Sequence, residues 1–395
     1  IFAGGRDGRD DDHPADQRVK RRLTKEKTGA GRRLRRFSPF EKGIWNSMNV
    51  VVTGATSFIG AVTVRQLLEQ GHQVAAVVRP GSANLCQLTA PLEGKADLLE
   101  RLQIVPLDLG QISRIGDVIG ETTDAAAAIA VGEPLPVADL HRLAAAGDPF
   151  PRAALRSHFA PADAWIHIGW DGAGSHNRTL RSVQQENVRH SLEAVKAAAG
   201  LGCRRFLFTG SQAEYGVHHE TITEDTPCRP VSEYGIAKVE FGRQAEALCR
   251  KLGMEYVHTR IFSVYGPGDH PWSLVQTCLS TWMDGGEMKL GECTQFWNFL
   301  YIEDTAAALV CLLTEGRPGV YNIAGNDTRP LRDYIEEMYR LCGSRGSFRY
   351  GERPQNAEGP ADLMPDIGRI CRETAWRPVT AFSEGIYETL HRLRA

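Results

Sequence analysis

The chain has 395 residues, of which 42% are hydrophobic and 24% are charged, and its formal net charge at pH 7 is -2. Its length exceeds the usual size of a single core, so a large α/β domain with a smaller lobe is expected. No apolar run is long enough to span a bilayer, and no signal-peptide pattern is present. We therefore expect a cytoplasmic protein with no membrane partner.

The nine cysteines lie singly along the chain, with no C-x-x-C spacing. An odd number without a pattern fits reduced thiols rather than a disulfide framework. The cysteines indicate no metal site.

Charge is spread unevenly. Residues 1–47 carry 13 positive and 7 negative side chains, whereas the remainder carries 33 and 41. The basic clusters Lys20–Arg22 and Arg32–Arg36 would suit nucleic acid or an anionic membrane surface. The same segment is rich in glycine and charge and poor in core-forming residues, which favours a disordered tail over a nucleic-acid-binding one.

Residues Asn49–Gly60 read as a strand, a tight turn and the start of a helix that ends near Gly71. A run of β-branched apolar residues breaks at Gly54, and the apolar positions after Ile59 recur at helical spacing. Such a turn directs free backbone N–H groups and the positive end of the helix dipole at one point, which suits a pyrophosphate. Gly54 allows the turn and Gly60 allows the helix to pack closely, as in dinucleotide-binding folds. The residues expected to bind the dinucleotide here are Gly54, Thr56, Ser57, Phe58, Ile59 and Gly60.

A second strand at Gln73–Val78 completes a βαβ unit, which separates this glycine pair from an ordinary βα turn. Arg79 follows it, at the position where a carboxylate would hold the adenosine ribose hydroxyls. A guanidinium there suits a 2′-phosphate and favours NADP(H) over NAD(H). The alternative is a solvated arginine at a strand end.

A third strand is predicted at Leu102–Leu107, followed by Asp108 and Leu109 beside the expected adenine site. Asp108 would accept from the adenine amine, or simply start a turn. The Ala- and Pro-rich segment 120–160 then predicts an insertion of extra helices or a lid.

A fourth strand at Ala164–Ile168 leads into a glycine-rich loop, where open α/β sheets bind ligands. The helix Arg181–Ala199 follows, and its Asn187 is polar among apolar neighbours. Asn187 would organise backbone or water near the site, or lie on the surface.

Tyr234 and Lys238 carry the predicted chemistry. They follow the fifth strand, Arg204–Thr209, and Ser211, and lie four residues apart on one face of a helix. A free tyrosine has a pKa near 10 and is a poor base at neutral pH, so a nearby ammonium and a nicotinamide cation are expected to lower the pKa of Tyr234. The Ser211 hydroxyl would hold the substrate oxygen.

From Met48 to its end the chain resembles an extended short-chain dehydrogenase/reductase of the NAD-dependent epimerase/dehydratase group, which modifies nucleotide sugars. The motifs that carry the resemblance are Thr53–Gly60, the Ser211 strand end, Tyr234-x-x-x-Lys238, Arg260–Gly268 and Phe299–Asp304. The resemblance implies that Tyr234 is the general acid/base, that Lys238 binds the nicotinamide ribose and tunes Tyr234, and that Ser211 orients the substrate. It also implies a homodimer.

The resemblance also matches two further parts of the chain to family positions. Asn187 matches a family asparagine in the helix before the catalytic strand. His167–Trp170 lies where the family often has His-x-Ala-Ala beside the cofactor.

The chain also departs from the family pattern. Ser57 replaces a glycine and would offer its hydroxyl to phosphate. Gln212 and Ala213 replace the acid pair of 4,6-dehydratases, and Glu214 comes one place late, so dehydration is disfavoured. Trp297 lies where an arginine often holds the diphosphate, which weakens the nucleotide-sugar assignment.

The C-terminal segment interleaves short helices and strands. We expect them at 272–284, 297–302, 305–313, 319–323 and 331–341. Asp304 is expected to cap the helix beginning at Thr305. Arg353 falls where the family binds diphosphate, although a solvated loop arginine would fit as well. The residues expected to contact the substrate are Trp170, Asn187, Trp297 and Arg353.

The expected fold is a Rossmann-type doubly wound parallel sheet over 48–266, with a smaller C-terminal α/β substrate-binding lobe over 267–395. The first functional hypothesis is an NAD(P)-dependent epimerase or ketoreductase acting on a nucleotide sugar, with NADP as the favoured cofactor. The alternatives are an NADPH-dependent reductase of a small carbonyl metabolite, which Trp170 and Trp297 near the pocket would favour, and a non-catalytic NAD(P) sensor.

Overall fold

Seven parallel strands form the central sheet of the protein, in the order β10-β6-β5-β4-β1-β2-β3. The structure is a computed structural model that describes residues 47–119, 161–173, 177–353 and 361–394. The strands are β1 (Asn49–Thr53), β2 (Gln73–Val78), β3 (Leu102–Pro106), β4 (Ala164–His167), β5 (Arg205–Ser211), β6 (Glu255–Ile261) and β10 (Gly319–Ile323).

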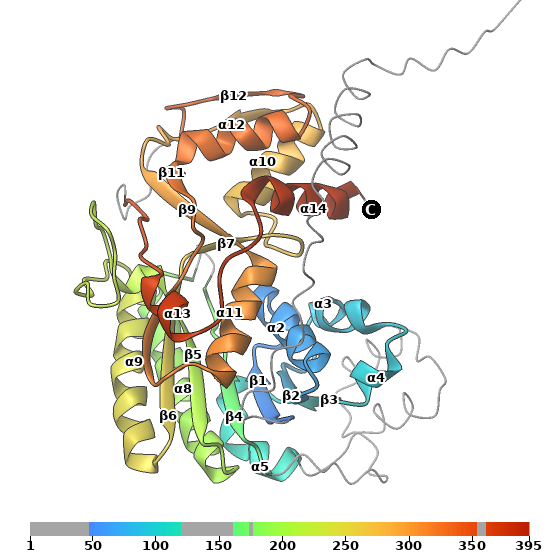
Figure 1. The fold of residues 1–395 in the computed structure, drawn as a ribbon, viewed down its shortest axis with the longest axis vertical. Helices are drawn as coiled ribbons and strands as arrows, with labels where there is room; N and C mark the ends of the chain where they lie inside the picture. The colour runs from blue at the N-terminus through green and yellow to red at the C-terminus, as the bar shows by residue number, and fades with distance from the viewer. Residues whose placement is uncertain (1–46, 120–160, 174–176, 354–360, 395) are drawn as a thin grey trace, which may run out of the picture. The chain divides into compact units, whose positions relative to one another are not determined.

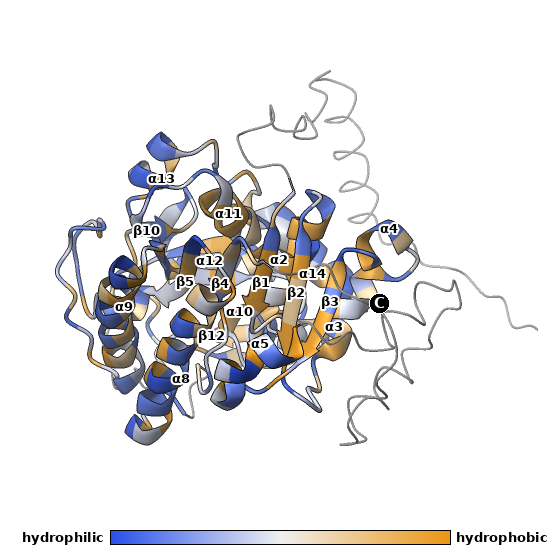
Figure 2. Cartoon of the chain, turned by 90° about the horizontal axis from the view of Figure 1, so that it is seen from below, coloured by the Kyte–Doolittle hydropathy of each residue, from blue (hydrophilic) through white to orange (hydrophobic). Residues whose placement is uncertain are grey.

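The strand order reverses beside β1, which pairs with β2 on one side and β4 on the other. Val50, Val51 and Val52 are fully buried there, because both faces of the sheet are covered. Figure 2 shows the same continuous hydrophobic character along β1 and β2. The carboxyl ends of β1 and β4 therefore meet at the switch point where doubly wound sheets bind ligands.

Two pairs of long helices cover the sheet (Figure 1). On one face α8 (Arg181–Gly200) packs along α9 (Glu233–Leu252), and on the other α2 (Phe58–Glu69) packs along α11 (Ile302–Thr314). The sheet with its two helical layers is the predicted Rossmann-type architecture.

A smaller lobe lies beyond the carboxyl ends of the strands (Figure 1). Its helices surround a core that includes Trp282, Tyr334 and Phe382. The elements of the lobe are β7 (Ser263–Tyr265), α10 (Leu274–Met283), β8 (Glu287–Lys289), β9 (Phe296–Tyr301), β11 (Thr328–Pro330), α12 (Leu331–Leu341), β12 (Ser347–Arg349) and α14 (Phe382–Arg394). Strands β11, β9 and β7 form one sheet, and β12 pairs with β8.

Short helices complete the described chain. They are α3 (Leu85–Thr89), η1 (Ala90–Leu92), α4 (Ala96–Leu99), η2 (Leu109–Arg114), α5 (Ile115–Val118), η3 (Gln212–Glu214) and α13 (Gly368–Glu373).

The expected boundary at residue 266 does not separate sheet from lobe. After the first part of the lobe the chain returns: α11 packs on α2, and β10 pairs with β6 to complete the sheet. Arg65 on α2 forms an ion pair with Glu303, and Gln66 donates to the Glu303 carbonyl at 3.0 Å. Residues 47–395 accordingly form one compact unit.

The expected cap at Asp304 was wrong. Helix α11 begins at Ile302, and Asp304 lies inside its first turn. Its carboxylate accepts instead from the backbone N–H groups of Val379 and Thr380, at 3.1 and 2.9 Å. Asp304 therefore fastens the segment that leads into α14.

Several predicted bounds agree with the structure. Strands Gln73–Val78 and Gly319–Ile323 and helix Leu331–Leu341 have the expected ends. The expected tail and the expected insertion at 120–160 lie outside the described residues, apart from Ser47 in the tail. Among the described helices, none has the length and apolar character needed to cross a membrane.

Candidate active site

The turn between β1 and α2 is as tight as its glycines suggested. Gly54 has φ +71°, and a Cβ there would lie 2.6 Å from the backbone nitrogen of Gly169 on the neighbouring strand end. A Cβ on Gly60 would overlap the carbonyl oxygen of Gly54. Only glycine therefore fits at these two places, and the first backbone N–H groups of α2 face the switch point with no partner inside the helix.

The side chains of this turn have structural roles. The Ser57 hydroxyl caps α2 by accepting from the Gly60 N–H at 3.1 Å. Thr56 shares a hydrogen bond with Ser82, at 3.2 Å between their hydroxyl oxygens. Phe58 and Ile59 pack against the lobe core. The close glycine backbone and the N–H groups at the start of α2 fit the pyrophosphate of a dinucleotide.

Arg79 lies at the end of β2 between two acids. Its guanidinium is 3.6 Å from a carboxylate oxygen of Asp108 and 3.8 Å from one of Asp171. All three side chains are at least half exposed. Asp108 also caps the turn at Leu109 by accepting from the Gly110 N–H at 2.8 Å, and Leu109 lies over Gly169. The three charged groups thus form one cluster at the edge of the expected adenosine site.

Asn187 fixes the loop that follows β4. Its side-chain oxygen accepts from the Asp171 N–H at 2.9 Å, and its side-chain nitrogen donates to the Asp171 carbonyl at 2.7 Å. Gln184, one turn earlier on α8, accepts from the Trp170 indole at 2.8 Å. Asn187 therefore organises backbone, and Trp170 is held in place by a residue that the sequence analysis did not identify.

The structure brings Ser211, Tyr234 and Lys238 together. Ser211 ends β5, and its hydroxyl accepts from the Ala213 N–H at 3.2 Å. Helix α9 begins one residue before Tyr234, and Gly235 lets it pack against this turn, because a Cβ there would lie 2.5 Å from the Ala213 carbonyl oxygen. Against the effect of burial, the Ser211 hydroxyl lowers the pKa of the Tyr234 phenol, so the two hydroxyl groups belong to one site.

Lys238 is a buried ammonium among aromatic rings. Its Nζ donates to the Thr209 carbonyl at 2.9 Å and lies 3.9 Å from the ring centroid of Trp170 and 4.6 Å from that of Phe208. Burial lowers the pKa of Lys238 to about 7, which the Glu214 carboxylate partly opposes. A cation on an aromatic face is stabilised by the ring quadrupole, so Trp170 supports the charged amine.

The expected lowering of the Tyr234 pKa depends on a bound nicotinamide cation as well as on Lys238, and it stays a prediction. In the polypeptide without the cofactor, burial raises the pKa of Tyr234, while Arg178 and the Ser211 hydroxyl oppose this rise. Arg178 lies with its guanidinium carbon 4.4 Å from the centre of the Tyr234 ring. Sequence reasoning missed Arg178, because the loop before α8 shows no motif around it.

A cavity of about 380 Å³ borders the Ser211 turn. Gln212 and Ala213 line one wall, and the lobe supplies Trp297 and Arg353. Trp272, which is 64% exposed, lies in the same wall. Two of the four residues expected to contact substrate, Trp297 and Arg353, thus line one cavity. Trp170 and Asn187 are not among its lining residues.

Residues 50–324 match the NAD dependent epimerase/dehydratase family. The chain belongs to this family. The dTDP-glucose 4,6-dehydratase of Streptomyces griseus is 27% identical over 280 residues, covering 64% of this chain and 84% of that protein.

Solved structures of family enzymes share the fold. A UDP-N-acetylglucosamine 4-epimerase from Methanobrevibacter ruminantium superposes with a TM-score of 0.69 at 20% identity, covering 89% of this chain and 99% of that one. A dTDP-glucose 4,6-dehydratase from Streptomyces venezuelae with NAD bound gives 0.68 at 22% identity, with coverage of 87% and 96%. The chain is an enzyme of the extended short-chain dehydrogenase/reductase type, in a family whose members use a nicotinamide dinucleotide and act on nucleotide sugars.

Proposed function

We propose that this enzyme is an NAD(P)-dependent ketoreductase or epimerase acting on a nucleotide-activated sugar. The observation that carries the proposal is the buried Lys238 amine 5.6 Å from the centre of the Tyr234 ring, with Ser211 on the adjoining turn and a cavity lined by Gln212 and Ala213 beside that turn. A phenol and a hydroxyl that share one site can hold and protonate a single sugar oxygen.

Each side chain has a defined task in this proposal. A bound nicotinamide dinucleotide supplies the redox partner of the reaction. Tyr234 gives a proton to the sugar oxygen or takes it back, and Ser211 holds that oxygen by a hydrogen bond. Lys238 donates to the ribose and stabilises the phenolate that forms when Tyr234 loses its proton. Because burial raises the pKa of Tyr234, the phenol is protonated at neutral pH, which favours the direction that reduces a keto sugar.

Dehydration is not proposed, although the Streptomyces griseus relative is a dehydratase. Elimination needs an acid and a base next to the reacting carbon, and Gln212 and Ala213 provide neither. The Glu214 carboxylate is fully buried and is held by Arg260 and His258, so it does not face the substrate.

NADP is the cofactor we propose, with Arg79 as the group that meets the 2′-phosphate. Two carboxylates now lie against this arginine, so a phosphate would compete with Asp108 and Asp171 for it. NAD remains the alternative and is the cofactor bound in the Streptomyces venezuelae structure.

For the substrate we propose a nucleoside diphosphate sugar, with Arg353 as the diphosphate contact. The apolar lining of the same cavity, including Trp297, Leu290 and Leu363, supports a second candidate, reduction of a small apolar carbonyl compound. We also propose a cytoplasmic homodimer, which the family resemblance implies, and light scattering would test the dimer.

The deciding experiment measures binding and turnover on the purified protein. Thermal shift with a panel of nucleotide sugars, with and without NADP or NAD, identifies the ligand pair. Turnover that consumes added NADPH indicates a reductase, whereas turnover with tightly bound cofactor and none added indicates an epimerase. Tyr234→Phe should bind both ligands but lose activity by at least about 100-fold. Failure of every nucleotide sugar to bind would refute the substrate class.

A further inference from the structure

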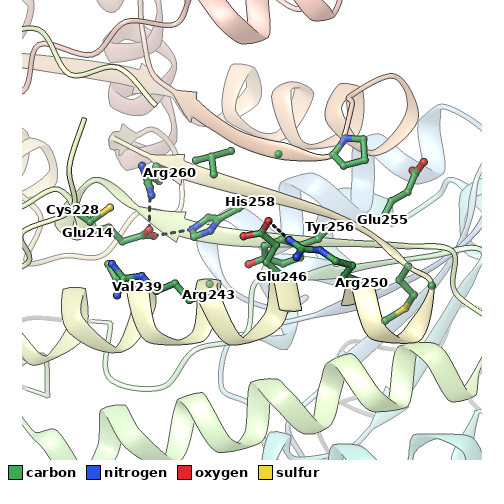
Figure 3. Close-up of a pocket in the computed structure, with 16 residues that line it drawn as sticks. Glu214, Cys228, Val239, Arg243, Glu246, Arg250, Glu255, Tyr256, His258 and Arg260 are labelled. Carbon is green, nitrogen blue, oxygen red and sulfur yellow. Dashed lines mark hydrogen bonds and ion pairs between the residues drawn. The ribbon is translucent and has the colours of Figure 1, made fainter. Parts of the chain in front are cut away.

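Glu214 is the most enclosed charged residue near the candidate site. It is the last residue of η3, the short helix that follows Ser211, and its side chain is fully buried. One carboxylate oxygen accepts from the Ser211 backbone N–H at 2.8 Å and faces His258 Nε2 at 3.0 Å. The other accepts from Arg260 Nε at 3.0 Å. Figure 3 shows both side-chain contacts, which reach Glu214 from strand β6.

Two glycines make room for this carboxylate and its histidine. A Cβ on Gly210 would overlap both the Glu214 carboxylate and the His258 ring. A Cβ on Gly242 would lie 2.5 Å from His258 Cε1. Gly242 is one helical turn after Lys238 on α9, so His258, which contacts Glu214, packs against the same face of the helix as Lys238.

The electrostatic influence of Glu214 reaches both titrating members of the site. Burial raises the pKa of Glu214, but His258 and Arg260 outweigh burial and hold it below its usual range, so the side chain is ionised. Burial is the largest influence on Lys238 and Tyr234; beyond it, the Glu214 charge raises the pKa of each. This charge therefore favours the ammonium of Lys238 and the neutral phenol of Tyr234.

Among the described residues, few other charged or titratable groups face Glu214 and Lys238. Arg178 and His167 interact with Lys238, where Arg178 opposes the effect of Glu214 and His167 is neutral because burial lowers its pKa to about 3. On the far side of Glu214, Cys228 and Tyr256 line a cavity of about 540 Å³ between α9 and β6 (Figure 3). Among the described acids, Glu214 is the one whose charge raises the pKa of Lys238.

We propose that Glu214 is the positioning residue of this site: its carboxylate fixes the turn that presents Ser211 and is the internal counter-charge of the Lys238 ammonium. This proposal rests on the proposed function in one respect: it takes Ser211, Tyr234 and Lys238 as the catalytic residues. Glu214 touches neither substrate nor cofactor and acts through the residues that do.

The first test measures the protonation of Lys238 directly, without turnover. The chain has nine lysines, so carbon-13 labelling of the lysine side chains gives few signals, and Lys238→Arg assigns the one from Lys238. In Glu214→Gln, which keeps an acceptor for the Ser211 N–H but removes the charge, the Lys238 midpoint should fall by about one pH unit or more. His258→Gln is the matched control, because it removes a neighbour but keeps the carboxylate, and its midpoint should not fall.

An unchanged Lys238 midpoint in folded Glu214→Gln would overturn the counter-charge role. Removing one member of a buried ion pair can prevent folding, so Glu214→Gln is also made together with Arg260→Met, which leaves no unpaired charge. The double variant should show the same fall in the midpoint.

The positioning role is tested with a nucleotide sugar that the wild type turns over. Glu214→Asp keeps the charge but is one methylene shorter, so it should retain the Lys238 midpoint and still lose kcat by about tenfold with KM little changed. Wild-type kcat in Glu214→Asp and Glu214→Gln would overturn this role. If the wild type turns over no nucleotide sugar, the proposed function fails, while the lysine titration still decides the counter-charge.

Discussion

At the scale of single residues, the burial of Lys238 changes both the pKa of its amine and the stability of the fold. An ammonium enclosed by Trp170 and Phe208 loses hydration that one hydrogen bond to Thr209 does not replace. Its pKa falls to about 7 as a result. The burial that lowers this pKa therefore also destabilises the folded chain.

The stability cost of Lys238 depends on pH. Between about pH 7 and pH 10.5 the unfolded chain keeps a proton on this amine that the folded chain lacks, so unfolding becomes easier as the pH falls. Below pH 7 the amine is charged in both states and the cost is constant. Lys238→Met should be most stabilised relative to wild type at about pH 7 and below. This difference in the free energy of unfolding should shrink toward pH 10 by up to about 1.4 kcal/mol per pH unit. Urea unfolding across that range measures it.

Lys196→Met is the matched control for this experiment. The Lys196 side chain is 57% exposed and pairs with Glu193 on its own helix. Its difference from wild type should not vary over the same pH range. A pH-independent difference for Lys238→Met would contradict a lowered pKa at this residue.

Arg79 permits a prediction about cofactor choice. Asp171→Asn removes one of the two carboxylates against this guanidinium and leaves Asp108 in place. Affinity for NADPH should rise about tenfold relative to NADH, whereas Arg79→Ala should shift the preference toward NADH. Fluorescence titration of both dinucleotides checks this, and equal ratios in all three proteins would remove Arg79 from cofactor recognition.

At the scale of elements, the β1–α2 turn depends on close backbone approach. The Gly60→Ala change places a methyl group against the Gly54 carbonyl, so the turn must open and its N–H groups must separate. Nicotinamide dinucleotide affinity should fall at least about tenfold. Gly200→Ala is the control, because that glycine ends α8 with open space around it and should bind the dinucleotide like wild type.

Sequence reasoning predicted elements best where one pattern dominated. The apolar run at Gln73–Val78 and the amphipathic pattern at Leu331–Leu341 each predicted where the element begins and ends. Strand β6 was not predicted as a separate element. Asp304 was misread because its partners, Val379 and Thr380, lie far along the chain, where spacing gives no signal.

The candidate site was likewise predictable where a local pattern encodes it. The four-residue spacing of Tyr234 and Lys238 put both side chains on one helix face, as found. Arg178, Gln184 and the role of Glu214 became visible only in three dimensions. Each of these residues acts through a contact with a different element, and no local pattern encodes such a contact.

At the scale of the whole molecule, the sheet and the lobe depend on each other. Strand β10 and helix α11 come after most of the lobe in sequence, yet they complete the sheet and cover α2. A chain of residues 47–266 would leave the edge of β6 and one face of α2 uncovered.

We therefore expect residues 47–266 alone to aggregate or remain unfolded, while residues 47–394 unfold in one cooperative transition. Circular dichroism with heating compares the two. A folded, cooperatively melting 47–266 fragment would show that the expected boundary at 266 marks an independent domain after all.

The late return of β10 also bears on how the protein is made. While the ribosome is still translating the lobe, β6 is the last strand of the sheet available, and its outer edge has no neighbour until residue 323 has emerged. The nascent chain thus carries an open sheet edge while residues 262–323 are being made. A chaperone that covers this edge should reduce association between nascent chains, and production at low temperature, where hydrophobic association is weaker, should raise the yield of active enzyme.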